Sequence, residues 1–283
     1  MNPGILEQQT SPQSRTPRHL MGAPQTFWSP TLLLFLGCLT LGGLGAWGYA
    51  YWGWWKAVPF IFNLLIFYFL GTVLHDAAHG VAHRSRWMNE WIGISAALLQ
   101  GFALPIFRRT HNQHHANTND PEKDPDYYVS TGGGLWTLSF RFAHHELFFF
   151  KHKLYQQNDL LVWGFTRVLQ IAMLITVWKM GIMVELCNLW FTPALICGHL
   201  LVLFFDYIPH RPFINTARWR DTRVYPGNLT NILLLGQNYH LVHHLWPTVP
   251  WYRYQEAYFY TEDQLRANGS PFGIFRPSKM RNS

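Results

Sequence analysis

The chain has 283 residues, of which 49% are hydrophobic and 17% aromatic, yet its mean hydropathy is only -0.03. A bundle made wholly of membrane-spanning helices is apolar almost throughout, so we expect roughly half of this chain to lie outside lipid. The net charge of +7 does not predict nucleic-acid binding, because the basic residues are scattered around apolar segments and form no stripe. Cys38, Cys187 and Cys197 lie in apolar stretches without a CxxC pair, which favours small core residues over a disulfide framework.

Four apolar segments are long enough to cross a membrane as helices. Residues 1–26, which precede them, are polar and proline-containing and predict a flexible tail. The segments run over Pro30–Tyr49, Ala57–Leu74, Leu160–Met180 and Glu185–Asp206. The connection within each pair is short, so we expect two transmembrane hairpins.

The remaining segments predict a helical cap on this bundle. Residues Trp87–Phe107 are apolar but interrupted by Gly93, Gly101 and Pro105, which favours a helix that lies on the membrane surface or dips into it. Residues Tyr207–Ser283 are polar and predict a soluble part. We therefore expect an all-α integral membrane protein, with a catalytic domain over residues 27–265 and a C-terminal tail over 266–283.

The basic residues predict the orientation of the bundle. Nearly all of the 22 Lys and Arg residues fall within residues 1–28, 75–159 and 207–283; Lys56, Arg167 and Lys179 are the exceptions. Short loops rich in Lys and Arg stay on the cytoplasmic side of a membrane. Both termini and every histidine cluster are therefore predicted to be cytoplasmic.

Ten of the 15 histidines carry the strongest functional signal. Nine of them form three clusters, HDAAHGVAH, HNQHH and HLVHH, and the tenth, His210, stands alone in DYIPHRPF. Spacings of three and four residues place imidazoles on one face of a helix. Neutral imidazole is a common ligand of iron, copper and zinc. Acidic residues are not placed as ligands, unlike those of carboxylate-bridged di-iron bundles, so we expect a site of two metals held almost wholly by imidazoles.

Ligand imidazoles need hydrogen-bond partners behind them. The sequence offers Asp76, Asn112, Asp206 and Asn238 for that role. His83, in HRSR, is either an ordinary residue beside the membrane or another such supporting group, and we favour the second interpretation. The other histidines are interpreted as interfacial or capping residues: His19, His144, His145, His152 and His199.

Two further segments leave alternatives open. The run NDPEKDPD, which contains Asp120, Glu122, Asp124 and Asp126, could bind a cation or form a rigid proline-containing turn. The aromatic stretch Trp246–Tyr260 could line an apolar substrate path or dock the cap on the membrane surface.

The order HDAAH, HNQHH, isolated histidine, HLVHH resembles the membrane fatty-acid desaturase and hydroxylase superfamily. Within it, the longer strings HDAAHGVAHR, THNQHHANTNDPEKDPD, DYIPHRPF and GQNYHLVHHLWPTVPWYRYQ resemble the β-carotene hydroxylases of cyanobacteria. The resemblance covers about residues 27–265. It implies four spans and a cytoplasmic di-iron site in a plasma or thylakoid membrane. It also implies O2 as co-substrate and an external electron donor, ferredoxin by this analogy.

The resemblance further implies a reaction and a set of metal ligands. The reaction is hydroxylation at carbon 3 of a β-ionone ring of β-carotene, which gives cryptoxanthin and then zeaxanthin. The ligands are His75, His79, His111, His114, His115, His210, His240, His243 and His244. For His210, we expect Pro209 to break the fourth span and turn the imidazole toward the site. His83, the third histidine of the first cluster, lies beyond the spacing that desaturases share.

Other functions remain open at this point. A fatty-acyl desaturase or a carotenoid ketolase of the same superfamily would carry similar clusters. A non-enzymatic alternative is a His-rich membrane metal-binding protein or a metal transporter. Transporters place polar ligands near the middle of the bilayer, and here only His199 lies inside a span, which makes that class the weaker one.

Overall fold

The computed structural model describes residues 15–273, and every regular element among them is a helix. The one pairing of extended residues in this range is an isolated bridge between Val224 and Phe272. In chain order the α-helices are α1 Pro30–Tyr51, α2 Ala57–Ala78, α3 Arg86–Leu99, α4 Leu104–Ala116, α5 Pro125–Thr131, α6 Leu138–Arg141, α7 His144–Lys151, α8 Gln157–Lys179, α9 Met183–Leu186, α10 Thr192–Val202, α11 Ile208–His210, α12 Asn228–Leu233, α13 His240–Leu245 and α14 Tyr254–Ala267. The all-helical prediction is confirmed for these residues.

Four helical segments are long and apolar enough to cross a membrane, as the sequence predicts. They are Pro30–Tyr51, Ala57–Ala78, Gln157–Lys179 and Met183–His210, and each overlaps one expected span. Among the 23 residues of α8, Thr166 is the one buried residue, and much of the helix surface is exposed. Its first half is tied to the neighbouring helices by the Arg109–Asp159 and Arg167–Glu146 ion pairs.

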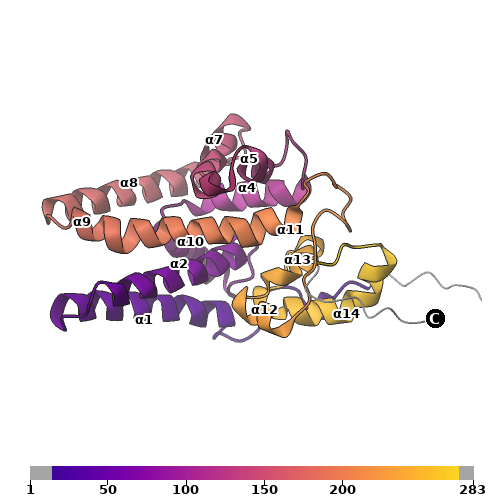
Figure 1. The fold of residues 1–283 in the computed structure, drawn as a ribbon, viewed down its shortest axis with the longest axis horizontal. Helices are drawn as coiled ribbons and strands as arrows, with labels where there is room; N and C mark the ends of the chain where they lie inside the picture. Colours follow the sequence, from indigo (N-terminus) through magenta and orange to yellow (C-terminus); the bar gives the residue numbers. More distant parts are fainter. Residues whose placement is uncertain (1–14, 274–283) are drawn as a thin grey trace, which may run out of the picture.

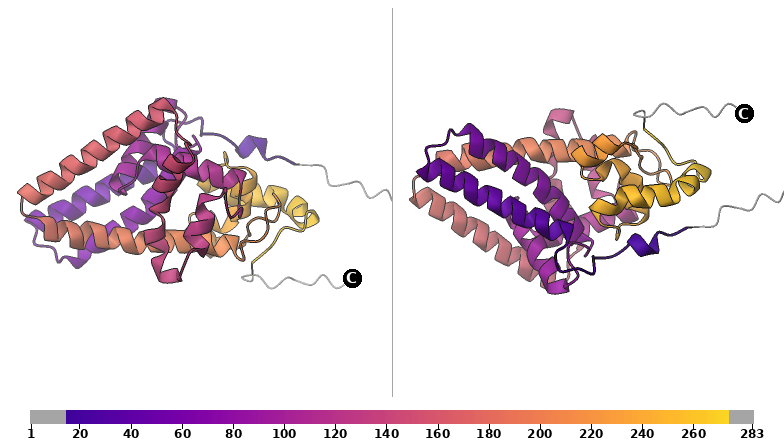
Figure 2. Two further views of the ribbon diagram at one scale, coloured as in Figure 1. Left: turned by 90° about the horizontal axis from the view of Figure 1, so that it is seen from above. Right: turned by 90° about the horizontal axis from the view of Figure 1, so that it is seen from below.

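The long helices share one end at which the cap is assembled. Figure 1 shows α1 beside α2, and α10 packs along α2, with the C-terminal ends of α2 and of the α10–α11 helix directed toward α4 and α13. Viewed from above and below, the long helices extend to one side while the yellow C-terminal helices lie at the other (Figure 2). Residues at the C-terminal ends of α2 and α11 therefore meet residues of the cap.

The apolar segment over residues 87–107 does not form one helix but is divided by a sharp bend. Helices α3 and α4 meet at an angle of 99°. Gly101 supplies the left-handed backbone angle (φ +81°) at this corner, and Pro105 occupies the first turn of α4, where its missing N–H is tolerated. The bend brings α4 back against α2.

Two side chains fix the end of α2 against this corner. Asn89 Nδ2 donates to the Ala77 carbonyl at 3.0 Å, and Arg108 Nη2 donates to the same oxygen at 3.2 Å. Arg108 is held in turn by a bidentate pair with Glu90, at 2.7 and 3.0 Å. The same carbonyl also accepts the Gly80 N–H at 3.2 Å, so these donors together hold the last turn of the helix in place.

The fourth apolar helix does not break at Pro209, which corrects our expectation. It passes through a wide π turn over Leu203–Tyr207 and continues as α11 through Pro209 to His210. The proline has no N–H to donate to the preceding turn, and the helix nonetheless continues to His210. Wide turns of this kind are common at functional sites, and this one precedes His210 directly.

The C-terminal part forms a core of its own. Tyr239, Leu241, Tyr254 and Tyr258 are almost wholly buried in it, together with Leu20 from the predicted N-terminal tail. The stretch Trp246–Tyr260 therefore packs inside the cap, and none of its residues lines the large cavity described below. The C-terminal part is less uniformly polar than the sequence predicts, because α12 exposes Leu229, Ile232 and Leu233.

A buried carboxylate joins this C-terminal core to the long helices. Asp76, at the end of α2, accepts a hydrogen bond from the Thr31 hydroxyl at 2.7 Å and one from the Trp251 backbone N–H at 3.3 Å. The Trp251 indole N–H also donates to Thr31, at 3.2 Å. Three segments far apart in the sequence therefore meet at one buried polar cluster.

We expect Thr31→Val to destabilise the protein. The change leaves an oxygen of Asp76 buried without its donor, which typically costs about 1–3 kcal/mol of unfolding free energy. Thermal unfolding of the detergent-solubilised protein measures the effect. Thr40→Val, at an exposed threonine that bonds only within α1, is the matched control and should stay within about 0.5 kcal/mol of wild type. Equal stabilities of the two variants would contradict the anchoring role of Asp76.

Candidate metal centre

Four imidazoles from three helices form the first group. His75 and His79 come from the end of α2, His111 from α4 and His243 from α13. One nitrogen from each lies within 4.8 Å of the others, a spacing that could hold a metal ion. The Nε2 atoms of His75 and His243 approach to 2.9 Å, and Nε2 of His79 is buried without a hydrogen-bond partner among the described residues.

The second group lies beside the first and also consists of four histidines. His114 of α4, His210 of α11, and His240 and His244 of α13 place one nitrogen each within 4.8 Å of one another. The Nε2 atom of His240 is 3.0 Å from that of His210 and 3.1 Å from that of His244. His210, the least supported of the predicted ligands, is thus brought to the same cluster as the others.

His115 lies between the two groups. Its Nε2 atom is 3.1 Å from Nε2 of His111, and its ring centroid is 4.5 Å from that of His243 and 4.4 Å from that of His244. All nine predicted ligands are therefore gathered in one place. Helices α4 and α13 each contribute to both groups, because residues three and four apart differ slightly in direction around a helix.

The spacing of the nitrogens fits shared metal ions. Two ligands about 2.1 Å from one ion, at angles of 90–109°, stand about 3.0–3.4 Å apart. The five closest Nε2–Nε2 approaches, 2.9 to 3.3 Å, match that range. Neutral imidazoles cannot all hydrogen-bond to one another in this way, because each has one donor and one acceptor. The donor set therefore fits two metal ions.

The partners behind four of the imidazoles are mostly residues that the sequence did not single out. Nδ1 of His243 is 3.0 Å from the Tyr254 hydroxyl, and Nδ1 of His114 is 2.8 Å from an oxygen of Asp124. The two further contacts are from His240 Nδ1 to Gln237 Oε1 at 3.4 Å and from His244 Nδ1 to Thr118 Oγ1 at 3.3 Å. Each contact on Nδ1 turns Nε2 toward the centre of the cluster.

The residues expected in this supporting role lie elsewhere or do something else. Gly80 (φ +74°) turns the chain away after α2, so His83 lies outside the cluster. Its ring nitrogens hydrogen-bond instead to the Phe27 carbonyl and the Ser85 N–H. Asn112 is exposed on α4. Asp76 anchors the C-terminal core, as described above, and Asn238 donates to the Tyr225 carbonyl.

Asp206 faces the cavity instead, where it accepts a hydrogen bond from Ser130 at 2.5 Å. It belongs to neither four-histidine group.

The NDPEKDPD run forms a turn beside His114, and one carboxylate oxygen each of Asp124 and Asp126 lies within 4.8 Å of a nitrogen of His114, a spacing that could also hold a cation. Asp124 accepts from the backbone N–H groups of Asn119 and Asp126 at 2.7 and 2.9 Å as well as contacting His114. Asp126 contacts His114 and also His145, which is buried and which we had interpreted as interfacial. Burial alone raises the pKa of the Asp126 carboxyl, but the His114 and His145 imidazoles lower this pKa below its usual value. Asp126 is therefore a carboxylate that can hold the imidazoles in place.

The ligand candidates of α13 are held in the form that binds metals. Burial, reinforced by neighbouring imidazoles, lowers the pKa of His240, His243 and His244 well below the usual value. These rings are therefore neutral near pH 7 and keep a free lone pair. Burial likewise holds the pKa of the Tyr254 hydroxyl well above its usual value, so this partner of His243 stays protonated.

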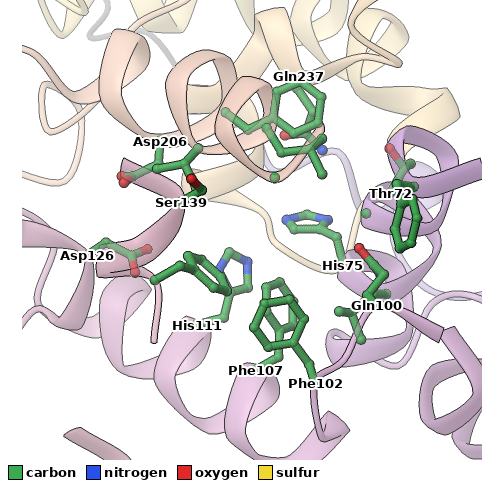
Figure 3. A pocket seen from close by; sticks show the side chains of 18 of the residues that line it. Thr72, His75, Gln100, Phe102, Phe107, His111, Asp126, Ser139, Asp206 and Gln237 are labelled. Carbon is green, nitrogen blue, oxygen red and sulfur yellow. The ribbon is translucent and has the colours of Figure 1, made fainter. Parts of the chain in front are cut away.

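A cavity of about 220 Å³ opens onto both histidine groups. His75 and His111 of the first group and His114 and His240 of the second line it. Figure 3 shows His75 and His111 near its middle, with Phe102 and Phe107 on one side and Asp126, Asp206 and Ser139 at the opposite end. The walls toward the long helices are apolar and come from α2 and α10. The site thus combines a candidate two-metal cluster with an apolar space between long apolar helices.

The chain matches the model of the fatty acid desaturase family over residues 52–276. It belongs to this family. The match includes the whole of both histidine groups and the cavity. The predicted membership of the desaturase superfamily is confirmed.

Individual relatives include both carotenoid and lipid enzymes. The chain is 25% identical over 209 residues to a zeaxanthin 4-ketolase of Chlamydomonas reinhardtii. This match covers 70% of the chain and 43% of the ketolase. The chain is 26% identical over 206 residues to beta-carotene 4-ketolase 3 of Haematococcus lacustris, and this match covers 68% of the chain and 59% of the ketolase. An sn-1 oleoyl-lipid 12-desaturase of Arthrospira platensis is 25% identical over 238 residues, with 69% and 66% covered. The chain thus spans about half the length of the two ketolases.

We expect Tyr254→Phe to weaken metal binding at the first group. Removing the hydroxyl leaves Nδ1 of His243 without its partner, and such changes typically cost about 10–100-fold in metal affinity or activity. Metal retention during dialysis against a graded chelator measures the loss. Tyr252→Phe is the matched control, since the Tyr252 hydroxyl has no partner among the described residues. Equal metal retention in both variants would show that Tyr254 does not hold His243.

Proposed function

We propose that the chain is a membrane oxygenase that hydroxylates carbon 3 of a β-ionone ring of β-carotene, giving cryptoxanthin and zeaxanthin, with two iron ions and O2. The observation that carries this proposal is the pair of four-histidine groups that face one apolar cavity. The family supports an oxidative enzyme, and the carotenoid enzymes among the relatives support a carotenoid as substrate.

The residues that would hold the two irons follow from the two groups. One ion would be bound by His75, His79, His111 and His243, and the other by His114, His210, His240 and His244, with His115 between them. Imidazole is a suitable ligand for iron. Bound iron supplies the activation of O2: one oxygen atom enters the C–H bond to give C–OH, the other leaves as water, and an external donor provides two electrons while two protons enter from solvent.

The protein's own residues position the ring and keep water away from it. Phe67, Leu201 and Phe205 give the cavity an apolar wall between α2 and α10, which matches a hydrocarbon ring. A long apolar substrate dissolves in the bilayer, so it reaches this wall from between the long helices. An unactivated ring C–H bond offers no acidic proton, so no side chain has to act as a general base.

The orientation and the electron donor form part of the same proposal. The Lys and Arg distribution favours a cytoplasmic location for both termini and the metal site, in a cyanobacterial plasma or thylakoid membrane. We propose ferredoxin as the donor. In support, Arg211, Arg220 and Arg223 line a second hollow beside His210, and a positively charged surface there suits an acidic donor.

The second candidate function is carotenoid ketolation. It is favoured by the printed activities of two relatives, a zeaxanthin 4-ketolase and a beta-carotene 4-ketolase. Both reactions begin with oxidation of a ring C–H bond at neighbouring carbons, so the same cavity and ligands serve either one. A fatty-acyl desaturase is the third possibility, by likeness to the oleoyl-lipid desaturase.

Expression in a β-carotene-producing bacterium separates these candidates. We expect pigment analysis by liquid chromatography and mass spectrometry to show cryptoxanthin and zeaxanthin, with β-carotene depleted. His243→Ala should abolish them, whereas His152→Ala, at a histidine stacked on Phe148 outside the cluster, should leave most of the activity. Ring ketones in place of hydroxyls would establish the ketolase. Unchanged pigments with newly unsaturated fatty acids would reject a carotenoid substrate altogether.

A further inference from the structure

The hydroxyl of Thr72 is an unpaired polar group in the wall of the large cavity. Thr72 is 1% exposed and lies on α2, three residues before His75. Its Oγ1 atom has no hydrogen-bond partner among the described residues. Buried hydroxyls in proteins are almost always paired, so an exception of this kind calls for a partner that is not part of the chain.

Other threonines in the helices show how a hydroxyl is usually satisfied. Six of them donate to the carbonyl four residues earlier in the same helix, the ordinary solution for a helical threonine. They are Thr40, Thr110, Thr131, Thr166, Thr176 and Thr261. Thr72 makes no such bond to Tyr68, although it lies in the middle of a regular helix. Its hydroxyl is therefore unpaired in a residue that lines the cavity.

The cavity has room at Gly198, which belongs to the facing wall on α10. A side-chain carbon added at Gly198 would meet no atom within 4 Å, so the space in front of it is open. At Gly71, the neighbour of Thr72, an added side-chain carbon would instead meet Leu201 at 2.8 Å. Figure 3 shows Thr72 and Gln100 on the same side of the cavity as His75. The amide nitrogen of Gln100 is already committed to the carbonyls of Leu70 and Ala96, at 3.1 and 3.2 Å.

We propose that Thr72 forms a subsite for an oxygen atom carried by the substrate ring. It hydrogen-bonds a ring carbonyl or hydroxyl, so the enzyme takes rings that already bear one oxygen in addition to unsubstituted rings. The inference rests on the proposed function only in taking the substrate to be a carotenoid. Its ligand class is an oxygenated cyclohexene ring at the end of a long apolar chain.

The position of Thr72 suits an oxygen close to the reacting carbon. Residues three apart on a helix lie on one face, with Cβ atoms about 5–6 Å apart. A six-membered ring that presents one carbon to the histidine groups at His75 therefore brings a substituent on the adjacent carbon within reach of Thr72. This hydrogen bond discriminates between substrates, because the buried Thr72 hydroxyl gains a partner from an oxygenated ring and stays unpaired with an unsubstituted ring.

The test compares two carotenoids in wild type, Thr72→Val and Thr72→Ser. The probes are β-carotene, which has no ring oxygen, and canthaxanthin, which has a carbonyl in each ring. We expect wild type to convert both, and Thr72→Val to lower the ratio of kcat/KM for canthaxanthin over that for β-carotene by about five- to tenfold, the usual size of one hydrogen bond. Thr72→Ser, which keeps the hydroxyl, should retain the wild-type ratio. Iron content and membrane insertion of each variant control for misfolding.

Two further variants sharpen the comparison. Gly198→Leu fills the open space and should slow both carotenoids, whereas Thr166→Val, at a threonine on α8 outside the cavity, should change neither. An unchanged ratio in Thr72→Val, or an equal loss for both carotenoids, would overturn the subsite. An unchanged ratio is also the result expected if a water molecule pairs the Thr72 hydroxyl.

Equilibrium binding keeps the inference separate from the proposed reaction. If wild type converts neither carotenoid, the proposed function fails, and the dissociation constants of the two probes then decide about Thr72. Tighter binding of canthaxanthin in wild type that is lost in Thr72→Val and kept in Thr72→Ser would retain the subsite. Equal preferences in wild type and Thr72→Val would reject it.

Discussion

Nine imidazole rings are packed together where α2, α4, α11 and α13 meet, and their Nε2 atoms face one another at 2.9 to 3.3 Å in five pairs. Burying polar atoms without proper partners costs free energy, and in this cluster the rings offer one another too few donors. The rest of the structure is organised around this constraint. Under the proposed function, two bound metal ions would make ligands of the unpaired nitrogens, and their binding free energy would also stabilise the fold.

The surrounding elements serve to bring these rings together and hold their direction. Arg108 and Asn89 fix the end of α2, the 99° bend brings α4 back against α2, and a π turn precedes His210 on the fourth helix. Asp76 joins α1 and α2 to the C-terminal core, which carries α13. The cavity lies where the cluster meets the apolar helices. Ligand positioning and substrate access therefore depend on the same junction.

The sequence predicted the four long helices and the convergence of the histidines well, because both follow from local periodicity. Runs of apolar residues determine the helices, and spacings of three and four determine which imidazoles share a face. The sequence could not predict how the clusters divide. His111 and His114 belong to the same motif but to different groups, as do His243 and His244, because that division depends on how the helices cross.

The supporting contacts were the least predictable part of the site. Tyr254 contacts His243 from another helix, and Asp124 reaches His114 through a turn, so neither contact follows from the spacing of the clusters. Three of the four neighbours chosen by proximity, Asp76, Asn112 and Asn238, point elsewhere, because adjacent residues on a helix face different directions. His83 continues the four-residue spacing in sequence, but it lies beyond the turn at Gly80. Local spacing therefore identifies candidate ligands better than it identifies their partners.

Anomalous diffraction from crystals of the protein isolated with its native metal tests the central claim most directly. The account predicts two metal peaks per chain, identified as iron by their absorption edge. Nε2 of His75 and His243 should lie about 2.0–2.2 Å from one ion, and Nε2 of His210 and His240 the same distance from the other. A single peak, or a second ion bound away from His210 and His240, would contradict the two-metal centre on which the proposed function depends.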